Sequence, residues 1–152
     1  MALFRSFFLL GAEPEERKEK RGPMDGQPHG AQERGKAAAT ISNAIAGLHR
    51  THYGRGPTRT RTVLGSDYVI CFLEDVYTTV ERTLIDAGRF DTVRETRNAF
   101  QETMREAFSE AVENALGRKV IGFLSQVHVN PDLSIETFIL EPDSADETAA
   151  EG

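Results

Sequence analysis

The chain has 152 residues, a net charge of −6 and a single cysteine, Cys71. This length is enough for one domain with a sizeable core, so no structural metal or disulfide is needed. One cysteine excludes a disulfide within the chain and fits a reducing compartment. Since no stretch approaches the roughly 18 apolar residues of a membrane span, we expect a soluble protein of the cytoplasm.

Residues 1–36 are predicted to form a disordered arm. An apolar start, Ala2–Gly11, precedes a charged stretch rich in glycine and proline. The apolar start is short and contains Arg5, so a signal peptide is not expected. Two alternatives stay open: an anchor to a membrane surface or partner, or a mis-assigned extension ahead of a natural start at Met24.

A helix is predicted from about Ala37, where apolar residues begin to recur at steps of three and four. Gly54 and Gly56 end it, and Pro57 favours an extended exit. A short strand over 60–64, a turn over 65–67 and a second strand over 68–73 then form a hairpin. The second strand is almost continuously apolar, which indicates a central position in a sheet.

Two more helices and a second hairpin follow. Thr78 and Glu81 have the spacing of a capping box, and Gly88 ends that helix. Asp91 is expected to cap a longer helix that Gly117 closes. Residues 119–129 and 133–140 are predicted as strands, with a possible bulge at Gly122 and a turn over 130–132.

These elements predict an α+β domain over residues 37–141, in the order helix, hairpin, two helices, hairpin. The hairpins can pair into one four-stranded antiparallel sheet with the helices packed on one face. Each hairpin follows a helix ending in Gly-Arg and ends in Leu-Glu, which is an internal repeat or a coincidence. Both faces of strand 68–73 are apolar, so the uncovered face predicts a homodimer or a long helix packing across it.

Residues 142–152 are predicted to be an acidic, disordered tail. From Glu141 to the end the chain has five acidic residues and no lysine or arginine. The acidity of the protein is therefore mostly a property of its tail. A docking role is the less favoured alternative to a solvated end.

No catalytic motif is present, so we expect no enzyme, no metal and no cofactor. Cys71 lies in an apolar strand and is interpreted as a small core residue. Glu74 and Asp75 could act as general bases or hold a cation, but pairing with Arg82 or capping is favoured. His49 and His52 are interpreted as exposed residues near a helix end.

The most distinctive feature is a basic window without any acidic residue between Glu33 and Asp67. Glycine lets backbone N–H groups approach an anion, and arginine binds phosphate or carboxylate in a fork geometry. The window is a candidate anion-, nucleotide- or partner-binding site; ordinary surface ion pairs are the alternative. Its candidate residues are Arg50, Gly54, Arg55, Gly56, Thr58, Arg59 and Arg61.

Several short motifs together resemble the MpsC-like family, formerly a domain of unknown function. They include the runs 41–45, 53–58, 73–75, 81–84 and 87–88, and later 93–94 with Arg97, 100–101, 117–120, 125–128, 131–132 and 138–141. The resemblance covers about residues 37–141. It brings no catalytic residues, and it places the family's glycine-arginine motif at Gly54–Thr58.

The resemblance implies a part in a cation-translocating system that generates membrane potential. The chain would then be a non-catalytic accessory or regulatory component with integral-membrane ion-transport partners, located in the cytoplasm or at the inner face of the membrane. A small anion- or nucleotide-sensing module that uses the basic window is the alternative. Nucleic acid is not expected as a partner, because the domain is acidic and lacks a known binding motif.

Overall fold

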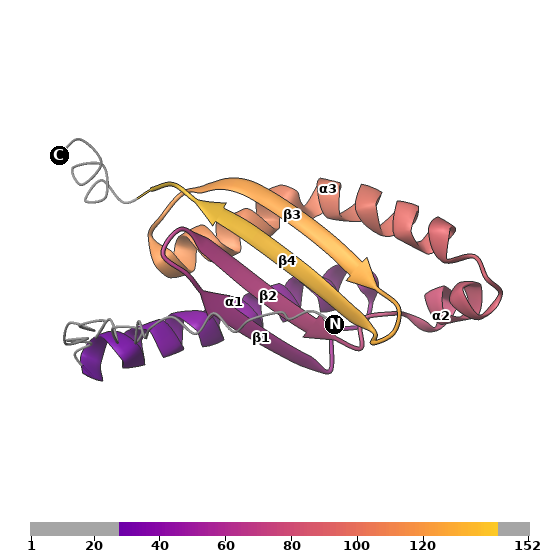
Figure 1. Cartoon of the computed structure of the whole chain (residues 1–152), viewed down its shortest axis with the longest axis horizontal. Coiled ribbons are helices and arrows are strands. Elements are labelled where there is room, and N and C mark those ends of the chain that lie inside the picture. The colour runs from indigo at the N-terminus through magenta and orange to yellow at the C-terminus, as the bar shows by residue number, and fades with distance from the viewer. Residues whose placement is uncertain (1–27, 143–152) are drawn as a thin grey trace, which may run out of the picture.

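The computed structural model describes residues 28–142, which form three helices and one four-stranded antiparallel sheet (Figure 1). Residues 143–152 of the predicted tail, and the predicted arm up to residue 27, lie outside the described residues. The elements in chain order are α1 (Pro28–Tyr53), β1 (Arg59–Leu64), β2 (Tyr68–Glu74), α2 (Thr79–Asp86), α3 (Phe90–Leu116), β3 (Val120–His128) and β4 (Leu133–Leu140).

Helix α1 begins at Pro28, nine residues before the predicted start at Ala37, so residues 28–36 do not belong to a disordered arm. Proline suits the first turn of a helix, where its missing N–H is not needed. The extension also has a tertiary contact, because Arg34 donates a hydrogen bond of 2.7 Å to the carbonyl of Leu64. Gly54, at φ 73°, ends the helix as predicted.

The four strands lie in the order β1-β2-β4-β3, with every neighbouring pair antiparallel. Each hairpin therefore contributes its second strand to the centre and its first strand to an edge. Both turns fall where the sequence predicted them, and a register shift between Val120 and Gly122 confirms the bulge. This order, which the sequence left open, gives the two helix–hairpin halves equivalent positions.

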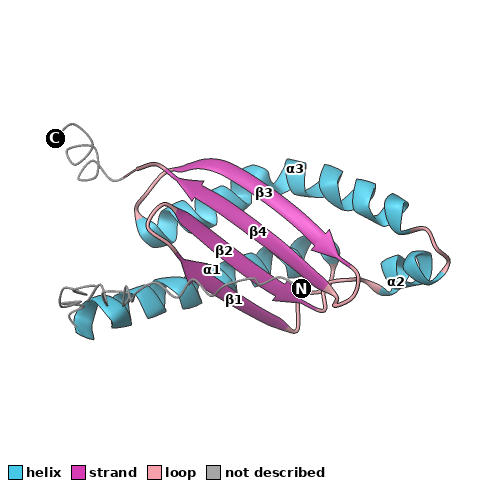
Figure 2. Ribbon diagram, viewed as in Figure 1, coloured by secondary structure: helices cyan, strands magenta, loops and turns pink. Residues whose placement is uncertain are grey.

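Helices α1 and α3 cover one face of the sheet, which confirms the predicted fold class (Figure 2). Val69, Cys71 and Leu73 point from β2 into this layer and are fully buried. Helix α2 and the start of α3 extend beyond the end of the sheet (Figure 1). The main core joins α1, α3 and strands β2, β3 and β4, and Leu64 of β1 packs against it. Its buried residues are Ile41, Ile45, Val69, Cys71, Leu73, Val76, Met104, Phe108, Val112, Phe123, Phe138 and Leu140.

The helix ends follow local sequence signals with one exception. Thr78 and Glu81 form the predicted capping box at the start of α2, and Gly117 ends α3 at φ 66°. Asp91, the predicted cap of α3, lies inside its first turn, because the helix already begins at Phe90. An acidic side chain there still interacts favourably with the helix dipole.

No described element covers the opposite side of the sheet, which we call the open sheet face (Figure 2). Residues paired across antiparallel strands point to the same side, so the registers identify its members. Its apolar residues, all exposed or half-buried, are Val63, Tyr68, Ile70, Phe72, Leu124, Leu133, Ile135 and Ile139. Its polar residues include Arg59, Arg61, Glu74, Gln126 and His128.

Candidate functional site

The structure separates the residues of the basic window. Arg50 is exposed on α1 and packs beside Gly56, on the helix side of the molecule. Arg59 and Arg61 are exposed on the open sheet face, where Arg59 lies 3.6 Å from a carboxylate oxygen of Glu74. The Arg61 guanidinium lies 4.3 Å from the centre of the Phe72 ring. The window is therefore continuous in sequence but does not form one pocket.

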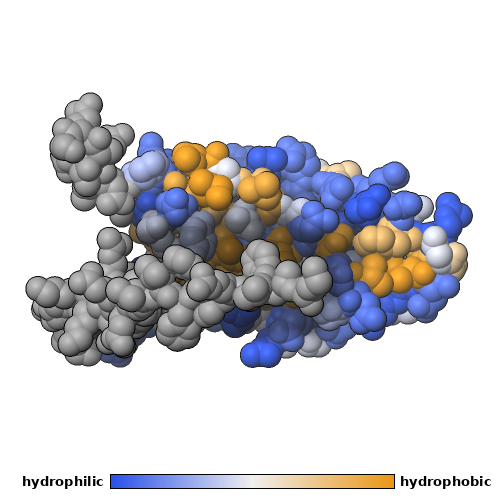
Figure 3. Space-filling model, viewed as in Figure 1, coloured by the Kyte–Doolittle hydropathy of each residue, from blue (hydrophilic) through white to orange (hydrophobic). Residues whose placement is uncertain are grey.

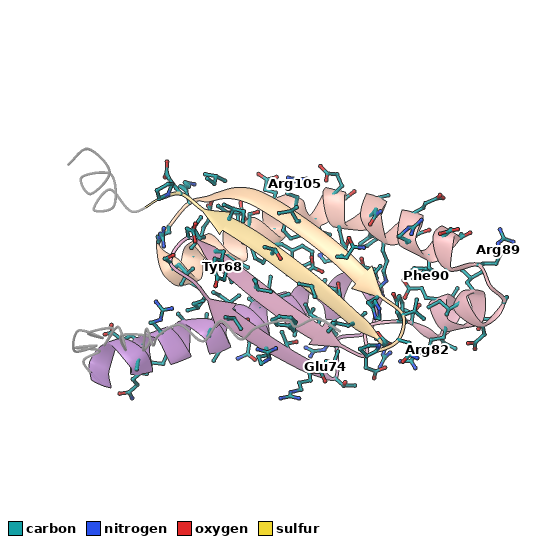
Figure 4. All side chains as sticks on the ribbon, in the orientation of Figure 1. Tyr68, Glu74, Arg82, Arg89, Phe90 and Arg105 are labelled. Carbon is teal, nitrogen blue, oxygen red and sulfur yellow. The ribbon has the colours of Figure 1, made fainter. Side chains whose placement is uncertain are left out.

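Arg55 belongs instead to a group of ion pairs that fastens the loops at one end of the sheet. It donates to Asp75 at 2.7 Å and to the Tyr77 carbonyl at 2.5 Å. Arg82 donates to Asp75 and, at 3.2 Å, to Asp132 (Figure 4 shows Arg82 beside the β3–β4 turn). The pairing of Asp75 with Arg82 agrees with the favoured interpretation of this acid.

Asp75 has a positive φ of 58°, a conformation that aspartate tolerates better than most residues. Its hydrogen bond from Arg55 holds the pKa of the Asp75 carboxyl below its usual value, and Arg82 adds to this effect. On the other side, Asp132 accepts hydrogen bonds from the backbone N–H groups of Val76 and Tyr77. These contacts hold the β2–α2 loop against the β3–β4 turn.

A shallow hollow of about 500 Å³ beside this group contains Thr58 and Arg61. It is also lined by three acidic residues, Glu74, Asp75 and Asp132. Negative charges around the hollow weaken the attraction of an anion to Arg61. An anion-binding role for the window stays a prediction, and this geometry does not favour it.

A buried ion pair joins α2 to α3. Arg97 is fully buried and donates to both carboxylate oxygens of Glu81, at 2.6 and 2.9 Å. It also donates to the Val76 carbonyl at 2.8 Å. Its guanidinium lies between the rings of Tyr53 and Tyr77, 4.6 and 4.9 Å from their centres. The bidentate pair and the two rings fix the position of the charge away from water.

We expect this pair to make the fold sensitive to acid. Burial raises the pKa of Glu81, but hydrogen bonds from Arg97 and the Thr78 backbone outweigh it, so the pKa lies below its usual value. Because the folded-state pKa is depressed, the stabilisation is present above the unfolded-state pKa and is lost as pH falls through the folded-state pKa. Urea unfolding between about pH 7 and 3 measures this loss. Glu81→Gln should flatten the pH profile, and an unchanged profile would contradict the assignment.

A second group of polar residues lies inside the core, around Glu136 on β4. Glu136 is fully buried and accepts hydrogen bonds from Ser134 at 2.9 Å and Gln101 at 3.4 Å. His49 Nε2 lies 3.7 Å from the same carboxylate oxygen, Oε1. Within residues 28–142, Glu136 Oε2, His49 Nε2 and Arg97 Nη1 have no hydrogen-bond partner.

The interpretation of His49 as an exposed helix-end residue is wrong, because only 1% of its surface is accessible. Its ring stacks on Tyr53, with ring centres 5.2 Å apart, and lies 5.5 Å from Phe108. His52, three residues later, points outward and is exposed as expected. The burial of His49 could have been inferred from its position four residues after Ile45, since residues four apart share one helix face.

The interpretation of Cys71 as a core residue agrees with its environment. The side chain is fully buried, and its sulfur lies 3.3 Å from the Thr62 hydroxyl. Burial raises the pKa of the thiol to about 11. At neutral pH the thiol is therefore protonated, which is the unreactive form.

Neither a metal-binding cluster nor a membrane-spanning helix is present in the described part of the chain. Residues 28–142 contain no group of three or more His, Cys, Asp or Glu side chains placed to hold a metal ion. Among the same residues, no helix is both long enough and apolar enough to cross a bilayer. The features that the structure presents outward are the open sheet face and the ion-paired loops at its end.

Comparison with known proteins gives one match. The profile of the family described as "Na+-translocating membrane potential-generating system (MpsC)" matches residues 33–142, which is nearly all of the described chain. No curated protein and no solved structure matches. The match includes residues 33–53 of α1 as well as both hairpins, so it extends over the whole sheet and the helices that cover it. The chain belongs to the MpsC family.

Proposed function

We propose that this chain is a non-catalytic accessory or regulatory component of a Na+-translocating membrane potential-generating system. The family description names such a system, and the open sheet face offers a surface for assembly. The observation that carries the proposal is the open sheet face, to which each of the four strands contributes at least one exposed or half-buried apolar side chain. Large exposed apolar patches rimmed by polar residues are typical of protein–protein contacts.

The proposed partner is an integral-membrane subunit of the ion-transport system, contacted at the inner face of the membrane. The apolar side chains in the middle of the open sheet face would be buried against it, with Arg59, Arg61 and Glu74 at one corner of the contact. Burial of apolar side chains supplies the affinity, while charged groups at the rim determine orientation and association rate.

Ile70→Lys is expected to weaken partner binding by at least about thirtyfold, since a central interface position contributes 2 kcal/mol or more. Ile70 lies in the middle of β2, opposite Val63 and Thr137 on the open sheet face. Tagged protein is used to capture partners from detergent-solubilised membranes, with identification by mass spectrometry. Recovery of a subunit of a cation-translocating complex, lost with Ile70→Lys, is the expected result.

Val80→Lys is the matched control, because Val80 is 71% exposed on α2 and lies outside the open sheet face. Urea unfolding is used to check that both variants fold equally well. Equal recovery of the membrane subunit with both variants would show that the partner binds elsewhere. Arg55→Ala is a poor probe of binding, because it would also break the contacts of Arg55 with Asp75 and Tyr77.

Anion or nucleotide sensing is the second candidate. The exposed guanidinium groups of Arg59 and Arg61 on one face favour it, while the acidic residues around Arg61 oppose it. A ligand that binds the native state raises the melting temperature by mass action. Inorganic phosphate and ATP should then raise it in the wild-type protein but not in Arg61→Ala. Without that shift, docking is the function that the fold supports.

A further inference from the structure

The two edges of the sheet differ in their protection. The edge strand β1 has Arg59 and Arg61 within its six residues, and Arg34 donates to the Leu64 carbonyl at its end. Helix α1 also packs against this strand, where Ser42 and Thr62 share a hydrogen bond of 2.7 Å. Charged residues and covering elements at an edge discourage pairing with a second sheet.

Helix α3 packs against the opposite edge strand, β3, but this strand lacks the charged residues of β1. It has nine residues and no Asp, Glu, Lys or Arg. Its only strand neighbour among the described residues is β4, so the backbone groups on its outer side have no strand to pair with. Two of its side chains, Ile121 and Leu124, are 62% and 60% exposed. Figure 3 shows hydrophobic side chains gathered over the first half of this strand.

A long, uncharged and apolar edge strand is favourable for pairing with another strand. The unpaired backbone N–H and C=O groups of β3 determine what kind of partner can bind there, because only an extended chain matches their regular spacing. The bulge between Val120 and Gly122 interrupts that spacing at one end. The segment suited to regular pairing is therefore Gly122–His128, with Leu124 and Ser125 near its middle.

We propose that β3 pairs antiparallel with β3 of a second copy of this chain, which joins the two four-stranded sheets into one. In a dimer with a two-fold axis through this contact, each β3 strand covers the edge of the other. No further edge of this kind then remains to extend the assembly. The absence of charge on β3 also matters, since two chains with a net charge of −6 repel each other. At this strand, no like charges are placed opposite each other.

This dimer does not depend on the proposed function. It leaves the middle of each open sheet face uncovered and places both faces on the same side of a continuous sheet. A dimer formed by stacking two open sheet faces would instead bury Ile70 and Phe72. The two arrangements therefore predict different variants that break the dimer.

The first test is the mass in solution by analytical ultracentrifugation of the full chain. The wild-type protein and Val80→Lys should sediment as dimers. Leu124→Lys should sediment as a monomer, because its dimer dissociation constant should be at least about tenfold higher. Ile70→Lys should remain a dimer. A monomeric wild-type protein, or a dimer that Leu124→Lys does not weaken, would overturn the proposal.

Cross-linking provides a second test that does not require loss of the dimer. A bifunctional maleimide of about 10 Å span should join two copies of Leu124→Cys, since adjacent strands lie about 4.8 Å apart. Val63→Cys is the matched control on β1, because seven strand spacings, or about 34 Å, would separate its two copies. The buried Cys71 should leave the wild-type protein unlinked. Efficient linking through position 63 and not 124 would assign the contact to another surface.

Discussion

Arg97→Met is expected to lower the free energy of unfolding by about 3–5 kcal/mol, the cost of breaking a buried ion pair. Methionine fills much of the space between Tyr53 and Tyr77 but cannot donate to Glu81 or to the Val76 carbonyl. The Glu81 carboxylate then loses its main counter-charge in a partly buried position. Urea unfolding at pH 7 measures the change.

Arg94→Met is the matched control, one turn earlier on α3. Arg94 is about half exposed and pairs with Asp91 at 2.9 Å, so its loss should cost less than about 1 kcal/mol. In the background of Glu81→Gln, the cost of Arg97→Met should fall, because the two residues form one interaction. If the cost of Arg97→Met is the same in both backgrounds, the stabilisation by Arg97 does not come from this pair.

Phe108→Ala is expected to destabilise the fold by a similar amount, about 3–5 kcal/mol, through lost apolar burial and the cavity that remains. Phe108 is 1% exposed on α3 and contacts Phe123, with ring centres 5.8 Å apart. It also lies against His49, so it links both main helices to the sheet. Thermal or urea unfolding gives the loss directly.

Val80→Ala tests whether the effect of Phe108→Ala comes from burial. Val80 is exposed, so its truncation should change the free energy of unfolding by no more than about 0.5 kcal/mol. Phe108→Leu should recover more than half of the loss, since leucine refills most of the cavity. A cost below about 1 kcal/mol for Phe108→Ala would mean that the core rearranges around this position.

The sequence by itself determined the identity and most boundaries of the elements, because local signals control them. Both hairpins are specified by turn residues between apolar runs, and β4 was predicted with its observed bounds, Leu133–Leu140. The Thr78 and Glu81 spacing specifies a helix start through hydrogen bonds within four residues. The start of α1 was predicted too late, because residues 28–36 lack an apolar stripe and Arg34 is held by a residue 30 positions away.

Only the tertiary structure decided which polar residues lie inside. Arg97 and Gln101 occupy the same stripe of α3 as Val93 and Met104, and Glu136 lies on the same face of β4 as Phe138. Their positions were therefore visible in the sequence, but their partners were not. Burial of such groups depends on neighbours from other elements: Glu81 for Arg97, and Ser134, Gln101 and His49 for Glu136.

The same reason explains the basic window and the sheet. Neighbours along a strand alternate between its faces and a turn redirects the chain, so Arg50, Arg55 and Arg61 point to three different surroundings. Strand order follows from which edges of the two hairpins pair, here β2 with β4, a long-range choice that no local motif encodes. Local chemistry thus gave the helices, turns and family of this chain, while packing between distant segments determined its buried charges, its open sheet face and its unprotected edge.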